Sequence, residues 1–135
     1  MDMFQELKKH PFVLAPMAGI TDNAFRSFMK ELGAGIVISE LISAHGINYK
    51  GARTLDLMRF EKKQTPVGIQ LFGETPEAVS EAAKYVQDQG ADFVDLNFGC
   101  PVKKVVSKGA GSAMLKDMAG LDAMVSTVKK AIDIP

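Results

Sequence analysis

Residues 67–96 read VGIQLFGETPEAVSEAAKYVQDQGADFVDL, and the fold class follows from them. The run Val67–Phe72 is largely apolar and of strand length. The residues Thr-Pro-Glu at 75–77 supply a hydroxyl cap, a first-turn proline and a first-turn acid, which together start a helix. Apolar residues at helical spacing continue to Gly90, and a second short apolar run, Phe93–Leu96, follows. This strand–helix–strand order predicts an α/β fold whose strands are parallel and joined by right-handed crossovers.

The same alternation extends over the rest of the chain. Two further strands are predicted at residues 12–15 and 36–38, and Ile134 with Pro135 resembles the approach to a fifth. Helices are expected over residues 21–33, 40–46, 51–60, 75–90 and 121–132. Two architectures fit this order: a small doubly wound sheet, or half of a (β/α)8 TIM barrel, whose complete form needs about 250 residues. Because the chain stops where a strand should begin, we expect the N-terminal half of a barrel with about four parallel strands.

Composition narrows the class of protein further. The chain has 135 residues, is 47% hydrophobic, and carries 16 Lys and Arg against 16 Asp and Glu, so its net charge is zero. These values indicate one folded domain and argue against coating of nucleic acid by bulk charge, although a local basic patch stays open. Cys100 is the single cysteine, which excludes an internal disulfide and a multi-cysteine metal site, and we expect no metal. Without a signal peptide or an apolar run of about 20 residues, we expect a soluble cytoplasmic protein that does not contact membranes.

Polar or conformationally unusual residues follow each predicted strand. They are residues 16–19 after the first strand, Ser39 and Glu40 after the second, Gln70 near the end of the third, and residues 97–101 after the fourth. Parallel α/β proteins carry their working residues at the carboxyl ends of the strands. Since all four segments fall at the same end of the predicted sheet, this end is the candidate site.

Cys100 is the candidate for chemistry at that end. An ordinary thiol has a pKa of about 8.5, so at neutral pH it serves as a general acid as readily as a nucleophile. The alternative, a small buried hydrophobic side chain, is equally open. No cysteine–histidine pair is expected, because His10 lies at the opposite end of the sheet and His45 is interpreted as a solvated or capping residue.

Two amides and one acid accompany the cysteine. Gln70 and Asn97 both donate and accept hydrogen bonds, which suits the edge of a flavin or a base. For Asn97, bonding to the backbone of its own loop is as good an interpretation. We interpret Glu40 as an acid at a helix N-terminus, in preference to a buried carboxylate that orders a loop.

The residues after Cys100 are basic and rich in glycine. The stretch 108–112 matches neither a P-loop nor a dinucleotide fingerprint and is interpreted as a mobile catalytic loop. Lys103, Lys104 and Lys108 form either a solvated face or a rim for a phosphate-bearing substrate. The apolar residues at helical spacing in the first long helix are expected in the core; they are Phe25, Phe28, Met29 and Leu32.

Taken together, these motifs match the pattern of a known protein family. The sequences APMAGITD at 15–22, SE at 39–40, QLFG at 70–73 and DLNFGCP at 95–101, with KKV at 103–105 and KGAGS at 108–112, resemble the tRNA-dihydrouridine synthases. The likeness is greatest to the bacterial B-type branch and covers essentially the whole chain. It implies an FMN-binding (β/α)8 barrel that reduces a uridine of tRNA to 5,6-dihydrouridine with NADPH.

The resemblance also implies roles for individual residues. Pro16, Met17 and Ala18 would lie against the flavin through backbone groups, and Gln70 would hydrogen-bond the isoalloxazine edge. Asn97 would hold the target uracil, and Cys100 would protonate its carbon 5 after hydride adds to carbon 6. The uridine would have to leave the tRNA fold to reach the flavin. The positive surface for tRNA phosphate would include Lys103, Lys104 and Lys108.

The chain ends before the family's later barrel strands. We therefore expect residues 1–135 to form a partial FMN-binding barrel domain, without the remaining barrel and the C-terminal helical tRNA-binding domain. Such a fragment is expected to bind FMN weakly or not at all, to be inactive alone, and to self-associate through its exposed edges. Two alternatives stay open: another FMN-dependent pyrimidine oxidoreductase, and a non-catalytic half barrel that self-associates.

Overall fold

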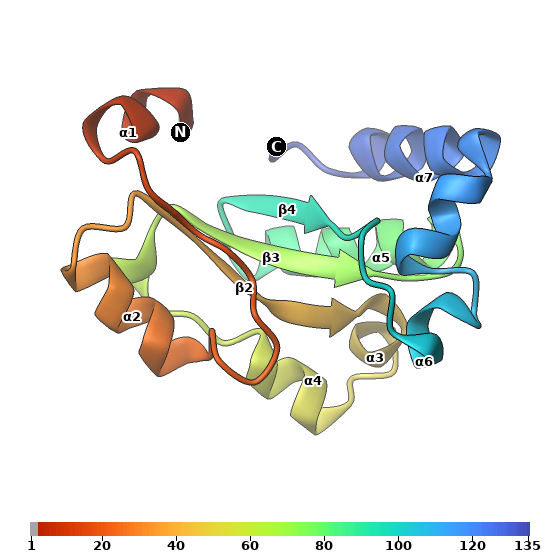
Figure 1. Ribbon diagram of the computed structural model, residues 1–135, viewed down its shortest axis with the longest axis horizontal. Coiled ribbons are helices and arrows are strands. Elements are labelled where there is room, and N and C mark those ends of the chain that lie inside the picture. Colours follow the sequence, from red (N-terminus) through yellow and green to blue (C-terminus); the bar gives the residue numbers. More distant parts are fainter. Residues whose placement is uncertain (1–2) are drawn as a thin grey trace.

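A computed structural model describes residues 3–135 and contains one sheet of four parallel strands. The strands are β1 (Val13–Leu14), β2 (Ile36–Ser43), β3 (Val67–Phe72) and β4 (Phe93–Leu96). They lie side by side in chain order, β1-β2-β3-β4 (Figure 1). A doubly wound sheet reverses its strand order at a switch point, whereas a barrel keeps the order of the chain. The sheet is therefore that of half a (β/α)8 barrel, as predicted.

Helices follow each strand and cover one side of the sheet (Figure 1). The connection after β3 is α5, which packs against α3 and α7. Its start is the predicted one, with Pro76 in the first turn and the Thr75 hydroxyl accepting a hydrogen bond from Ala78 N. The helical elements are α1 (Met3–Lys9), α2 (Asn23–Glu31), α3 (Ala44–Asn48), α4 (Ala52–Leu57), η1 (Lys62–Gln64), α5 (Pro76–Asp88), α6 (Lys103–Val106), η2 (Gly111–Lys116) and α7 (Met118–Ala131).

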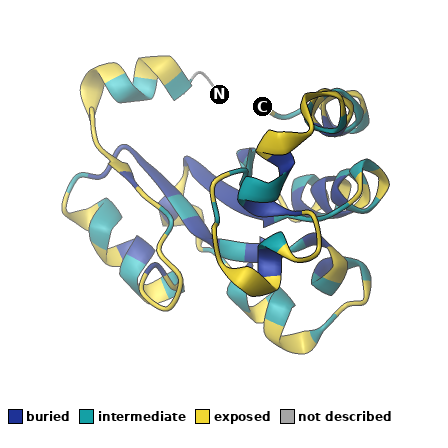
Figure 2. Ribbon diagram, turned by 45° about the vertical axis from the view of Figure 1, so that its right-hand side comes forward, coloured by how far each residue is buried: buried dark blue, intermediate teal, exposed yellow. Residues whose placement is uncertain are grey.

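The main core lies between the sheet and these helices, where Figure 2 shows buried residues along the strands and the inward faces of the helices. From β3, Ile69 and Leu71 point into this core and meet Val79 and Val86 of α5. Side chains alternate along a strand. Gly68 and Gln70 therefore face the opposite side, which is the interior of a barrel.

The second strand differs from the prediction. Residues 40–46 were expected to be helical, but β2 continues to Ser43, and α3 begins only at Ala44. The register shifts between Ile38 and Leu41, and pairing with β3 then resumes. Such an irregularity accommodates the polar pair Ser39 and Glu40 inside the strand, so the polar residues did not mark its end.

Other boundaries also shifted. The first strand is shorter than the predicted 12–15, and residues 3–9 form a helix that the sequence pattern did not predict. The prediction that Phe28 and Leu32 belong to the core is wrong, because they are 53% and 65% exposed. Within residues 3–135, no helix has the length and apolar character needed to cross a membrane.

Candidate functional site

The candidate site lies where the strands end. The arrowheads of β2, β3 and β4 point to the same side of the molecule, toward α6 (Figure 1). Gln70 stands opposite Asp95 in the register of β3 and β4, and Asn97 N donates to Leu71 O just beyond the paired region. The parallel register thus brings the predicted amides Gln70 and Asn97 to one place.

A chain of hydrogen bonds connects these side chains. Gln70 Nε2 donates to Asp95 Oδ2 at 2.6 Å, and Asn97 Nδ2 donates to Gln70 Oε1 at 3.2 Å. Asn97 Oδ1 accepts from Cys100 N at 2.9 Å and from Gly99 N at 3.3 Å. The amide oxygen of Asn97 therefore bonds the backbone of its own loop, which confirms one of the two interpretations of this residue. Its amide nitrogen faces Gln70 instead.

The thiol of Cys100 is free and half-buried. The carbonyl of Cys100 accepts a hydrogen bond from Ser112 N at 3.0 Å. Gly111 has a φ of 59° and packs so closely on Cys100 that a side chain at this position would overlap the Cys100 carbonyl. The predicted loop at 108–112 is thus partly η2, a 3-10 helix that fixes the outer side of the Cys100 turn. His45 is exposed and packs edge-on against Tyr49, as expected for a solvated residue.

The loop after β1 carries Pro16, Met17 and Ala18. It is closed by Met17 O, which accepts from Ile20 N and Thr21 N, each at 3.0 Å. Met17 and Ala18 are exposed, but Met17 N also donates to Thr21 Oγ1 at 2.9 Å, so of the two residues Ala18 lies outside the hydrogen bonds that close the loop.

Glu40 holds this loop in place. It is only 7% exposed within β2, and its Oε1 accepts a hydrogen bond from Gly19 N. Gly19 has a φ of 77°, a conformation that glycine adopts readily. The interpretation of Glu40 as a helix N-terminal acid is therefore wrong, and the less favoured one, a buried carboxylate that orders a loop, is confirmed.

Arg26 supports the site from behind and was not anticipated from the sequence. Its side chain is fully buried, and its guanidinium donates to Gln64 Oε1 and to the carbonyls of Thr21 and Arg59. Burial lowers the pKa of Arg26, while the charges of Glu40 and Asp22 act in the opposite direction. No simple spacing marks a buried arginine, because its partners come from three separate segments.

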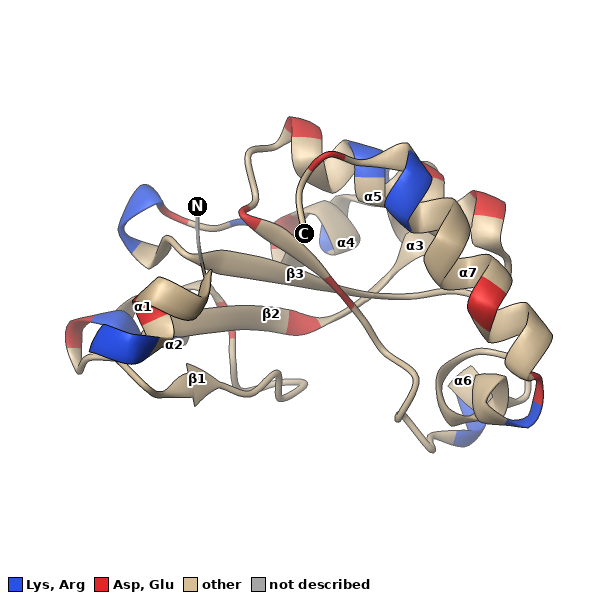
Figure 3. Ribbon diagram, turned by 90° about the horizontal axis from the view of Figure 1, so that it is seen from above, with Lys and Arg blue, Asp and Glu red and all other residues tan. Residues whose placement is uncertain are grey.

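The three predicted lysines lie beyond Cys100, and Figure 3 shows the basic residues of α6 at the outer end of the molecule. Lys103, Lys104 and Lys108 are all exposed. Lys108 Nζ lies 3.7 Å from Glu74 Oε1, which joins the loop after α6 to the end of β3. Lys103 and Lys104 therefore lie in α6, whereas Lys108 lies in the following loop and pairs with Glu74 just after β3.

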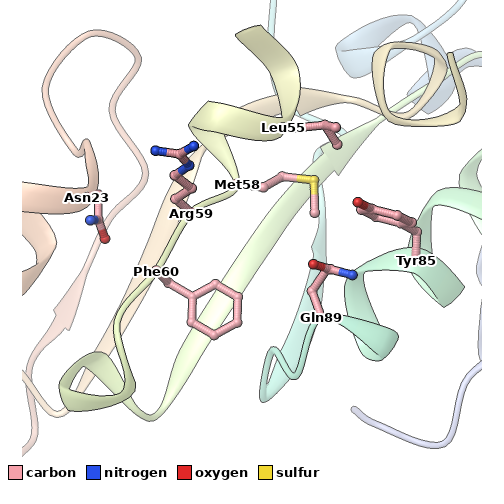
Figure 4. Close-up of a pocket in the computed structure, with 7 residues that line it drawn as sticks. All are labelled: Asn23, Leu55, Met58, Arg59, Phe60, Tyr85 and Gln89. Carbon is pink, nitrogen blue, oxygen red and sulfur yellow. The ribbon is translucent and has the colours of Figure 1, made fainter. Parts of the chain in front are cut away.

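A cavity lies elsewhere, away from the strand ends. It has a volume of about 460 Å³ and opens between α4 and α5 on the helical side, where Arg59 and Tyr85 line it (Figure 4). None of the predicted site residues lines it. Among residues 3–135, no group of three or more His, Cys, Asp and Glu side chains is arranged to hold a metal ion.

The fold is that of a barrel-type α/β protein, and its candidate site lies at the carboxyl ends of parallel strands. Comparison with known proteins gives the family. The family described as dihydrouridine synthase (Dus) matches residues 13–135, and the chain therefore belongs to the dihydrouridine synthase family. This confirms the resemblance found in the sequence.

Individual relatives agree. The chain is 39% identical over 123 residues to tRNA-dihydrouridine synthase B of Xanthomonas campestris pv. campestris, and 37% identical over 123 residues to that of Pseudomonas aeruginosa. It is 40% identical over 124 residues to a probable tRNA-dihydrouridine synthase of Rickettsia bellii. Each match covers 91% of this chain but only 37% or 38% of the relative. The chain thus spans well under half the length of the curated relatives that it matches.

Proposed function

We propose that this chain carries the proton donor and one wall of the flavin site in an enzyme that reduces uridine of tRNA to 5,6-dihydrouridine. The single observation that carries the proposal is the hydrogen-bonded chain that joins Gln70, Asn97 and Cys100 at the ends of β3 and β4. Family membership and the printed names of the relatives support the reaction and the tRNA substrate.

The residues present fit one edge of FMN. Gln70 and Asn97 each keep one amide N–H beyond those already used, and the exposed backbone of Ala18 lies outside the hydrogen bonds that close the loop after β1. Amides and open backbone groups suit the alternating donors and acceptors of a flat heterocycle. When bound, reduced FMN supplies the hydride for carbon 6 of uracil, and NADPH supplies the electrons that renew it.

The work of this chain is to hold the base and move a proton. Asn97 orients the uracil, and Cys100 gives its thiol proton to carbon 5, so that the double bond between carbons 5 and 6 becomes a single bond. The thiolate then takes a proton from water. The hydrogen bond from Cys100 N to Asn97 Oδ1 keeps the thiol and the base-holding amide in one rigid turn. Pro16 closes the flavin wall at the end of β1.

Lys103, Lys104 and Lys108 are proposed to contact tRNA phosphates around the extruded uridine. Their exposure and their position directly after the Cys100 turn support this assignment. A tRNA substrate also makes the cytoplasm the expected compartment. In this proposal residues 1–135 supply the first four strands of an FMN-binding barrel, whereas the phosphate site of FMN and the helical tRNA-binding domain lie outside them. The chain alone is then inactive and self-associates.

The function is tested in a chimera in which residues 13–135 replace the matching segment of Pseudomonas aeruginosa tRNA-dihydrouridine synthase B. Dihydrouridine is measured by mass spectrometry in tRNA from a host that lacks the modification. The chimera is expected to restore dihydrouridine, and Cys100→Ala to lower the rate by about 100-fold or more. Cys100→Ser, which keeps the size but loses the acidity, is expected to fall equally far. An FMN-loaded chimera that forms no dihydrouridine, or a Cys100→Ala variant with undiminished rate, would refute the proposal.

A further inference from the structure

Asp95 is the end of the hydrogen-bonded chain and has no role in the function proposed above. It lies in β4, half-buried, on the face of the sheet that carries Gln70. Its Oδ2 accepts from Gln70 Nε2 at 2.6 Å, the shortest of the three side-chain links to Cys100. An ionised carboxylate can only accept hydrogen bonds, so this end of the chain has a fixed direction.

The hydrogen-bond direction fixed at Asp95 also determines how the amides of Gln70 and Asn97 are oriented. Because Asp95 accepts, Gln70 must turn its NH2 group toward β4 and its Oε1 toward Asn97. Asn97 must then present its NH2 group to Gln70, which turns its Oδ1 toward the backbone N–H groups of Gly99 and Cys100. Reversing either amide would set donor against donor or acceptor against acceptor.

We propose that Asp95 is a positioning residue that sets the orientation of both amides and thereby holds the Cys100 turn closed. Its meaning for catalysis rests on the proposed function, because the amides and the thiol it orients are those assigned to flavin, base and proton. The carboxylate itself touches neither Cys100 nor the loop after β1 in the hydrogen bonds of the described residues. It acts through Gln70 and Asn97.

Asp92, near the other end of β4, provides a matched contrast. Its Oδ2 accepts from the backbone Val67 N at 2.8 Å, so it fixes the start of β3 and takes no part in the amide chain. Both side chains are half-buried carboxylates; Asp95 lies in β4, and Asp92 directly precedes that strand. Only Asp95 is connected to the candidate site, and the two should therefore differ in their effect on Cys100.

The test measures the rate at which iodoacetamide alkylates Cys100, the only cysteine of the chain. Asp95→Leu keeps the approximate size and removes the acceptor, so the turn should open and alkylation should become about fivefold faster, the value of one hydrogen bond. Asp95→Asn keeps an acceptor oxygen and should stay within about twofold of the parent protein. Asp92→Leu should also stay within about twofold. An Asp95→Leu rate equal to that of Asp92→Leu would overturn the proposal.

A double-mutant cycle shows whether Asp95 acts through Asn97. Asn97→Asp keeps an oxygen for the Cys100 amide but cannot donate to Gln70, so it cuts the chain in the middle. In this background Asp95→Leu should no longer change the alkylation rate. An equal effect in both backgrounds would mean that Asp95 only loosens the fold, and the proposal would fail. Should Asp95→Leu not fold, Asp95→Ala removes the same acceptor with a smaller side chain and carries the same expectations.

The alkylation rate needs neither cofactor nor tRNA. If the chimera shows that Cys100 is not the proton donor, the effect of Asp95 on the turn can still be observed. If Asp95 has no effect on the turn, the proposed reaction can still stand. The failure of one proposal is therefore distinguishable from the failure of the other.

Discussion

Arg26 is the largest fully buried side chain among the described residues, and it binds three segments behind the candidate site. Its partners are neutral oxygens: two backbone carbonyls and the amide oxygen of Gln64. They belong to the loop after β1, the segment that follows α4, and η1. A buried guanidinium stabilises the fold only while every one of its N–H groups has an acceptor. An N–H group without an acceptor would have given up its hydrogen bond to water and gained no bond within the protein.

Replacing this arginine should therefore be costly. Arg26→Leu is expected to lower the free energy of unfolding by about 3 kcal/mol, because the carbonyls of Thr21 and Arg59 lose their buried donor. Arg53 lies exposed in α4, and Arg53→Leu is expected to change stability by no more than about 0.5 kcal/mol. Urea unfolding of both variants checks the difference. Equal stability of the two would show that the network behind the site is dispensable.

For individual residues, it was easier to predict which ones belong to the candidate site than which groups they contact. Cys100, Gln70 and Asn97 were selected because strand ends carry function, and the structure brings them together. The bond between Gln70 and Asp95 depends on the register of two strands separated by a helix, which no local pattern reveals. Glu40 was misassigned for a related reason, since its partner Gly19 lies on a different strand's loop.

Among the elements, β3 and β4 have the predicted bounds and α5 starts at its predicted cap, whereas β2 continues five residues beyond its predicted end at Ile38. The start of α5 depends on neighbouring residues in the chain, because the Thr75 cap bonds Ala78 three residues later. The length of β2 depends instead on pairing with β3 beyond a shift in register. Local chemistry determines where a helix starts, whereas tertiary pairing determines how far a strand continues.

Gly68 of β3 provides a test of how β3 and β4 pack. A Cβ at this position would overlap the ring of Phe93, its register partner in β4. Gly68→Ala is expected to lower the free energy of unfolding by about 2 kcal/mol, as overpacking does. Phe93→Leu in the same chain should recover part of this loss, because the smaller side chain leaves room.

Gly99 serves as the control for this prediction, since a Cβ there would meet no atom within 4 Å. Gly99→Ala is expected to change stability by less than about 0.5 kcal/mol. Thermal unfolding of the three variants and the double variant gives the comparison. If Gly68→Ala were as stable as Gly99→Ala, the close packing of β4 on β3 would be wrong.

For the whole molecule, the outer strands of the sheet define its open sides. Beside β4, a cavity of about 150 Å³ is lined mainly by apolar residues of β4 and α7, among them Val125 and Val128. Val94 N donates to Pro135 O at 2.9 Å, so the segment after α7 already returns to the edge of β4. At the other side, Phe28 of α2 and Leu32, which directly follows α2, are exposed. The strand–helix order fitted both a doubly wound sheet and half a barrel, and the family resemblance favoured the barrel. Exposed edges were expected of a half barrel, but the sequence did not indicate which apolar residues would form them.

Self-association through these faces should depend on concentration. Size-exclusion chromatography with light scattering is expected to show a mass above 14.6 kDa that rises with concentration. Val125→Lys places a charge beside the β4 cavity and should shift the protein toward the monomer. Leu115→Lys, also at an exposed apolar residue but in η2, should leave the distribution unchanged. A monomer at all concentrations would contradict the proposed association.

The central claim is that flavin contacts the strand ends and not the larger cavity on the helical side. NMR of the isotope-labelled chain during titration with FMN to about 1 mM, which detects even weak binding, tests it most directly. The claim predicts shifts of the side-chain amides of Gln70 and Asn97 and of the backbone amides of Met17 and Ala18. The side-chain amides of Asn23 and Gln89, which line the larger cavity (Figure 4), should stay in place. Shifts at Asn23 and Gln89 with Gln70 and Asn97 unmoved would contradict the claim.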